Sequence, residues 1–380
     1  MIFTITKYFE VFFLAVMGYV VASNFGPVRY GKLTPYLLAV TYSAYFLLGV
    51  NQYVVKRVST GQLTVESGIS RMLFYFFLSI PVTMVFLSYL FYNDYKEWLF
   101  VVIILNLLRS IGIALARVTD SMSQLSISNF LSSLVFVLLA LFYIDSIQHY
   151  IISWAIASCA ALVVLLVGVN LKGSYFSEAL SYSKQFKNLP ESLAFVWTGL
   201  ITTHYLTAER FILIRGEVSD ETLGFYQFAD QISLVIYIGL SSLVFFYTPR
   251  IYAYFNGHNN MSRREISMIF MLILFAPIAA YGLAFLLQLI LGRFLPEYVA
   301  SYIPLFQTLL AKIYLVILVT LSTIMFAKGL QRFYISVATL LIGMVYCVSL
   351  FIDSYSFVIY TNLTSLLILA SLVLIKLYKT

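Results

Sequence analysis

Charged residues are scarce in this chain: they make up only 10% of its 380 residues, whereas 62% of the residues are hydrophobic. A soluble globular domain carries roughly 25% charged residues, so this composition cannot cover a water-exposed surface. The chain is therefore predicted to be a polytopic membrane protein. Twelve spans of about 22 residues would leave about nine residues for each connection or tail. No extramembrane catalytic domain fits, and we do not expect an enzyme.

Potential metal ligands are also few, with two cysteines and three histidines in the whole chain. Cys159 and Cys347 lie far apart in separate apolar runs, and His204 stands in a polar stretch with no second histidine nearby. A zinc site needs about four Cys, His or carboxylate ligands at close spacing. The sequence therefore predicts no disulfide, no metal site and no cofactor.

The net charge of +7 does not indicate a nucleic-acid partner, because most Lys and Arg residues stand singly at the ends of apolar runs. They act as topology signals under the positive-inside rule. An N-terminus in the cytoplasm puts most cations on the inner side and predicts that both termini are cytoplasmic. The outer side then holds only Arg29, Lys32, Lys96, Arg215 and Arg293.

Apolar runs between polar breaks predict an all-α fold of about twelve transmembrane helices. The predicted spans are 8–24, 33–54, 70–91, 98–116, 122–143, 150–169, 191–213, 222–247, 265–288, 303–326, 333–352 and 355–375.

The longest polar connection divides the chain into two predicted six-helix bundles, residues 1–170 and 191–380, joined by a cytoplasmic linker at 171–190. An internal repeat supports this division, because one constant offset relates three pairs of residues: Gly31 and Gly224, Arg57 and Arg250, Arg71 and Arg264. Pro81 and Pro277 also occupy the third span of each half. We expect two parallel repeats, an arrangement in which transporters bind substrate between the halves.

Short motifs in both halves resemble a known family. They are Ala208–Leu213, Leu223–Ala229 and Pro249-Arg250 in the second half, with Asn24–Pro27, Tyr30-Gly31 and Leu48–Asn51 in the first. In this order and spacing they are similar to the Wzx-type polysaccharide flippases of the multidrug/oligosaccharidyl-lipid/polysaccharide (MOP) exporter superfamily. Glu209 stands where the family usually has Asp, which keeps the charge.

The resemblance implies a flippase in the bacterial plasma (inner) membrane, built on the MOP flippase-like fold. Such a protein moves an undecaprenyl-pyrophosphate-linked oligosaccharide, an O-antigen or other surface-polysaccharide repeat unit, from the cytoplasmic to the periplasmic leaflet. Implied partners are this lipid-linked substrate, membrane lipid, and H⁺ or Na⁺ as the coupling ion. A polysaccharide polymerase and a chain-length regulator are further candidate partners.

Two cations near the bilayer midplane are the main candidates for binding the pyrophosphate: Arg109 in the fourth span and Lys312 in the tenth. Ionisable residues at this depth are costly and are usually functional. Because these spans are equivalent under the repeat, both cations are expected to face one central cavity that opens alternately to either side. The alternative is that each cation pairs with an intramembrane carboxylate such as Asp230 and holds helices together.

The remaining candidate residues lie nearer the span ends. Arg210, beside Glu209 at the outer end of the seventh span, either contacts headgroups or lines the cavity mouth. Arg57 and Arg250 at cytoplasmic span ends are explained by the positive-inside rule, or they receive the pyrophosphate. Asp230, with Glu209 as second candidate, is the predicted ion-coupling carboxylate.

Three other functions compete with the flippase. A cation-coupled drug or small-molecule exporter of the same superfamily is the first alternative, but it would need an acidic cavity, whereas the predicted midplane is basic. A membrane polysaccharide polymerase would need a sizeable outer loop, and the outer connections here are short. A purely structural subunit leaves Arg109 and Lys312 unexplained.

Overall fold

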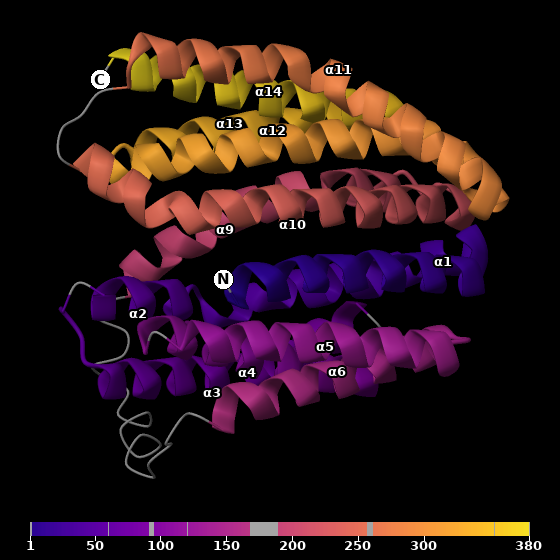
Figure 1. Cartoon of the computed structure of the whole chain (residues 1–380), viewed down its shortest axis with the longest axis horizontal. Coiled ribbons are helices and arrows are strands. Elements are labelled where there is room, and N and C mark those ends of the chain that lie inside the picture. The colour runs from indigo at the N-terminus through magenta and orange to yellow at the C-terminus, as the bar shows by residue number, and fades with distance from the viewer. Residues whose placement is uncertain are drawn as a thin grey trace. The chain divides into compact units, whose positions relative to one another are not determined.

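The computed structural model describes residues 2–59, 61–90, 95–119, 121–167, 189–256, 261–352 and 354–379. These residues form twelve α-helices and two short 3₁₀ helices, which confirms the predicted all-α fold (Figure 1). Eleven of the twelve predicted spans each fall on one described helix, and the second, 33–54, is interrupted at Leu48 and Gly49. Most of the predicted linker at 171–190 lies outside the described residues.

The helices group into two compact units. Unit 1 comprises Met1–Asn24 and Pro35–Leu200, and unit 2 comprises Phe25–Thr34 and Ile201–Thr380. Helices α1 (Ile2–Ser43) and α9 (Leu189–Arg215) each contribute to both units.

Helix α1 is broken at Gly26, whose backbone is non-helical with φ 66° and ψ 169°. This φ lies in the region that favours glycine, and Pro27 then suits the first position of the next helical segment. The break lies between the first two predicted spans, at the predicted Asn24–Pro27 turn. A second break follows at Leu48 and Gly49, which have φ values of 47° and 71°. Local backbone conformation therefore sets where the first span ends and where the second is interrupted.

Unit 1 continues from α1 through the 3₁₀ helix η1 (Ala44–Leu47) and five further helices. These are α2 (Val50–Ser59), α3 (Val65–Leu90), α4 (Lys96–Val118), α5 (Met122–Phe142) and α6 (Ile147–Val167). Helix α4 packs against α2, α3, α5 and α6 and so lies at the centre of this helix group (Figure 1).

Unit 2 is built around α12 (Tyr302–Ala327), which contacts four neighbouring helices (Figure 1). The neighbours are α10 (Asp220–Asn256), α11 (Arg263–Phe294), α13 (Gln331–Phe351) and α14 (Tyr355–Lys379). The 3₁₀ helix η3 (Pro296–Ser301) joins α11 to α12. Pro81 in α3 and Pro277 in α11 lie in the third helix of each predicted half, as the repeat requires.

Ten helical segments in the described part of the chain are long and apolar enough to cross a membrane. They number fewer than the predicted spans because the first two merge into Tyr8–Leu47 and because no part of α9 is among the ten. Exposed apolar side chains recur at helical spacing along α11: Phe270, Leu274, Ile278, Tyr281, Phe285 and Leu289. A surface this apolar suits lipid, and the chain is a multi-pass membrane protein.

Candidate functional site

Four charged side chains are buried together in unit 2. Glu209 and Arg210 come from α9, Asp230 from α10 and Lys312 from α12. Their exposed fractions are 1%, 8%, 2% and 1% respectively. Burial of this completeness is rare for charged residues unless they are paired. We call these four residues the charge cluster.

Asp230 is the centre of the charge cluster because each of its carboxylate oxygens pairs with a different cation. Asp230 Oδ1 lies 2.7 Å from Lys312 Nζ, and Asp230 Oδ2 lies 3.0 Å from Arg210 Nη2. The sequence analysis gives two alternatives for Lys312: it faces a cavity, or it pairs with an intramembrane carboxylate such as Asp230. The structure shows the pair with Asp230. Arg210 is likewise buried against Asp230.

The two cations also share one backbone acceptor on α9. Lys312 Nζ donates to the carbonyl oxygen of Leu206 at 2.6 Å, and Arg210 Nη2 donates to the same oxygen at 3.4 Å. Arg210 Nη1 donates to Gln227 Oε1 at 3.2 Å. Three helices are therefore held together by charge-assisted hydrogen bonds, which are stronger than neutral ones.

Glu209 differs from Asp230 in its surroundings. Neither carboxylate oxygen of Glu209 has a hydrogen-bond partner among the described residues, although Lys312, Asp230 and Arg210 are all near enough to act on it electrostatically. An ionised carboxylate that is buried without a donor is costly. Glu209 is therefore the carboxylate of the charge cluster whose oxygens no hydrogen bond from a described residue satisfies.

Neutral polar groups extend the site along α10 and α12. Tyr226 donates to Gln307 Oε1 at 2.5 Å, and Ser233 and Thr308 share a hydrogen bond of 2.7 Å. Gln227, Asp230 and Ser233 follow each other at three-residue spacing, so they lie on one face of α10. The contact between α10 and α12 is thus polar over more than one turn.

Arg109 lies in unit 1, and its contacts differ from those of Lys312. Its guanidinium donates to Asn129 Oδ1 at 2.9 Å and to Ser132 Oγ at 3.3 Å, both on α5. It forms no ion pair with a described residue, although Glu10 is within electrostatic range. Because Arg109 and Lys312 belong to different units, a cavity that both cations share stays a prediction.

Arg57 contacts its own neighbourhood at the end of α2. It donates to the Gln62 carboxamide, and its guanidinium lies 5.6 Å from the ring centroid of Tyr53. Arg71 contacts the same tyrosine and donates to its hydroxyl at 3.1 Å. Arg250, the predicted counterpart of Arg57, belongs to α10, but its side chain lies outside the described residues.

Three residues of the site were not identified from the sequence. Asn129 and Ser132 on α5 accept hydrogen bonds from Arg109, and Gln307 on α12 accepts one from Tyr226. Asn129 and Ser132 are polar residues at three-residue spacing in a predicted span, and this signal was available. No group of His, Cys, Asp and Glu in the described ranges is arranged to hold a metal ion.

No protein-family model matches this chain, and no curated protein sequence matches it significantly. Similar solved structures do exist. A multidrug resistance MATE family transporter of the MOP superfamily, in an inward-facing conformation, is 12% identical, with a TM-score of 0.51 over 100% of this chain and 95% of that one. A MATE structure in the bent conformation is also 12% identical, with a TM-score of 0.51 over 100% of this chain and 93% of that one. Likeness at this identity concerns the fold, and this chain has the fold of the MATE transporters of the MOP superfamily.

Proposed function

We propose that this chain is a cation-coupled flippase that moves an undecaprenyl-pyrophosphate-linked oligosaccharide to the outer leaflet of a bacterial inner membrane by alternating access. The MOP fold supports a transporter, and the short sequence motifs support this substrate class. The observation that carries the proposal is that the buried cations have different kinds of partners. Lys312 and Arg210 both pair with the Asp230 carboxylate, whereas neutral groups hold Arg109.

This difference suggests that unit 1 binds the substrate and that unit 2 couples transport to an ion. Arg109 keeps a charge that no contacting carboxylate cancels, so it is suited to bind a pyrophosphate. The charge cluster carries two acids and two bases, and its formal charge is zero when Glu209 is ionised. Protonation of Glu209 would make it +1 and weaken the hold of the two carboxylates on Lys312. Glu209 would then link ion uptake to the conformational equilibrium of unit 2.

The coupling role predicts a specific defect for Glu209→Gln. This variant mimics the protonated carboxyl permanently, so the imposed gradient should no longer accelerate transport, while slow downhill movement continues. The assay uses proteoliposomes with undecaprenyl-pyrophosphate-linked N-acetylglucosamine and follows its access to a glycosyltransferase added outside, with and without an imposed proton or sodium gradient. We expect at least a tenfold loss of the gradient effect, which corresponds to about 1.4 kcal/mol of coupling.

Glu221→Gln is the matched control because Glu221 is an exposed carboxylate in the first turn of α10. It should respond to the gradient like the unmodified protein. Glu209→Asp, which keeps the titratable group, should retain part of the response. A normal gradient effect in Glu209→Gln would remove Glu209 from the coupling mechanism.

The substrate role predicts that Arg109→Gln slows flipping of the lipid-linked sugar by at least about tenfold, since one charge-assisted contact is lost. Arg109→Lys should retain part of the rate, and Lys96→Gln, an exposed change in the same helix, should be neutral. The same vesicles are tested for uptake of ethidium, a cationic dye.

The second candidate function is a cation-coupled small-molecule exporter. It is favoured by the likeness to MATE structures and by the charge balance of the cluster, which removes part of the case for a basic midplane. Rapid gradient-driven ethidium movement that is unaffected by Arg109→Gln, with no flipping of the lipid-linked sugar, would replace the flippase by this function.

A further inference from the structure

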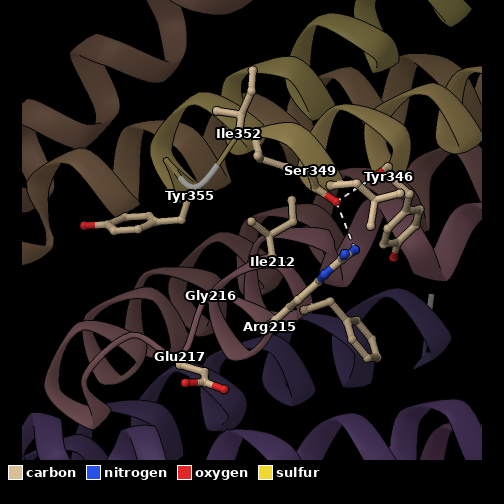
Figure 2. Close-up of a pocket in the computed structure, with 11 residues that line it drawn as sticks. Ile212, Arg215, Gly216, Glu217, Tyr346, Ser349, Ile352 and Tyr355 are labelled. Atoms are coloured by element: carbon tan, nitrogen blue, oxygen red, sulfur yellow. Dashed lines mark hydrogen bonds between the residues drawn. The ribbon is translucent and has the colours of Figure 1, made fainter.

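A pocket of about 410 Å³ lies in unit 2, where the C-terminal ends of α9 and α13 meet the start of α14 (Figure 2). Its volume is within the range of small-molecule sites. The lining has an apolar part, which includes Ile212, Leu350, Ile352 and Val358, and a polar part around Arg215. It uses a different face of α9 from the charge cluster, because Ile212 and Arg215 face α13 and α14 whereas Arg210 faces α10.

Arg215 is the charged group that defines the polar part. Its guanidinium donates to Ser349 Oγ at 3.0 Å, beside Tyr346 (Figure 2). It forms no ion pair with any residue in the described ranges. Glu217 also lines the pocket, but its carboxylate lies well apart from this guanidinium (Figure 2). The pocket therefore presents a positive charge with spare hydrogen-bond donors and neighbouring hydroxyl groups.

The surroundings of the pocket indicate how a ligand would reach it. Leu350, which lines the pocket, is 64% exposed, and the next residue, Phe351, which ends α13, is 86% exposed. Phe357 is 52% exposed on the first turn of α14. In a membrane protein, exposed apolar residues of this size face lipid, and arginine near a span end lies at the depth of lipid phosphates.

We propose that this pocket binds the phosphate of an anionic membrane lipid, with Arg215 as the phosphate ligand and the apolar lining as the surface for the start of the lipid chains. Guanidinium groups bind phosphate through paired hydrogen bonds. The site is separate from the charge cluster, and it does not depend on what the protein transports. By the predicted topology, it takes lipids from the outer leaflet.

The test titrates the full-length protein in detergent with dioctanoyl phosphatidylglycerol and follows the shift of the thermal unfolding midpoint. Arg215→Gln should weaken the apparent Kd about tenfold, the effect of one lost charge-assisted hydrogen bond. Arg293→Gln is the matched control, because Arg293 is an exposed arginine at the end of α11 that does not line the pocket. It should bind like the unmodified protein.

Two further ligands test whether the pocket recognises an anionic lipid, any lipid, or free phosphate. Dioctanoyl phosphatidylcholine, which has no net charge, should bind at least about tenfold more weakly, and inorganic phosphate alone should give no shift in the same range. Equal effects of the two lipids would overturn the recognition of negative charge. A full shift with inorganic phosphate would make this an ion site and overturn the lipid proposal.

Two milder variants test the proposal even if Arg215→Gln does not fold. Arg215→Lys keeps the charge but not the paired hydrogen bonds, and Ser349→Ala removes the acceptor that orients the guanidinium. Both should fold, since they leave the helix contacts in place, and both should bind phosphatidylglycerol with affinities between those of the unmodified protein and Arg215→Gln. Unchanged affinity in Arg215→Lys, Ser349→Ala and Arg215→Gln alike would show that Arg215 is not the phosphate ligand.

Discussion

Replacing Asp230 with Asn is expected to lower the free energy of unfolding by about 3–5 kcal/mol, the cost of leaving a buried charge without its partner. Asp230 is the ion-pair partner of both Lys312 and Arg210, so the substitution removes the partner of two buried cations in one step. Lys312→Met should cost less, because Asp230 then keeps its pair with Arg210. Unfolding of the purified protein in SDS titrations, followed by circular dichroism, measures both changes.

Asp220→Asn is the matched control for this prediction. It makes the same chemical change on the same helix, but Asp220 pairs with Lys32 at 3.9 Å with both side chains about half exposed. Exposed pairs contribute about 0–1 kcal/mol, so little change is expected. The double variant Asp230→Asn, Lys312→Met should be less destabilised than the sum of the single variants. Additive effects, or a larger cost for Lys312→Met than for Asp230→Asn, would contradict a shared counter-ion at Asp230.

The fold was largely predictable from the sequence because hydrophobic runs long enough to cross a bilayer are a strong signal. The break between the first two spans was also predictable, since Gly26 can adopt a positive φ and Pro27 has a fixed φ that suits the start of a helix. The second span was harder to delimit. It is made of the end of α1, η1 and α2, and left-handed backbone at Leu48 interrupts it. Gly49 is the one residue at this break that is typical of a turn, so the sequence signal for the interruption is weak.

The members of the charge cluster were predictable one by one, because intramembrane charges are few and conspicuous. Their joint arrangement was not. Glu209 and Arg210 had been assigned to the outer end of their span, yet packing of α9 against α10 and α12 buries both beside Asp230. Depth within a span follows from counting residues, but the partner of a buried charge depends on how the helices rotate against each other, which one sequence does not specify.

Two glycines related by the sequence repeat make a reciprocal contact within unit 2. A Cβ atom built on Gly31 would lie 1.8 Å from the carbonyl oxygen of Asp220, and one built on Gly224 would lie 1.8 Å from that of Pro27. Pro27 and Asp220 each precede the repeat-related glycine by four residues. Each glycine therefore approaches the repeat-related counterpart of the residue four positions before it, so that the contact is the same from both sides.

This reciprocity predicts that Gly31→Ala and Gly224→Ala have large and similar effects. The atoms that would clash belong to the backbone and cannot rotate away, so each variant should be destabilised at or above the upper end of the usual 1–3 kcal/mol for overpacking. Gly282→Ala in α11, where an added Cβ meets nothing within 4 Å, should be neutral or slightly stabilising because alanine favours helix. Yield and unfolding midpoint of the purified variants give the comparison.

Since both glycines serve one contact, the double variant should be little worse than either single one. Independent, additive losses would mean that the two glycines do not form one symmetric crossing between residues 25–34 and the start of α10.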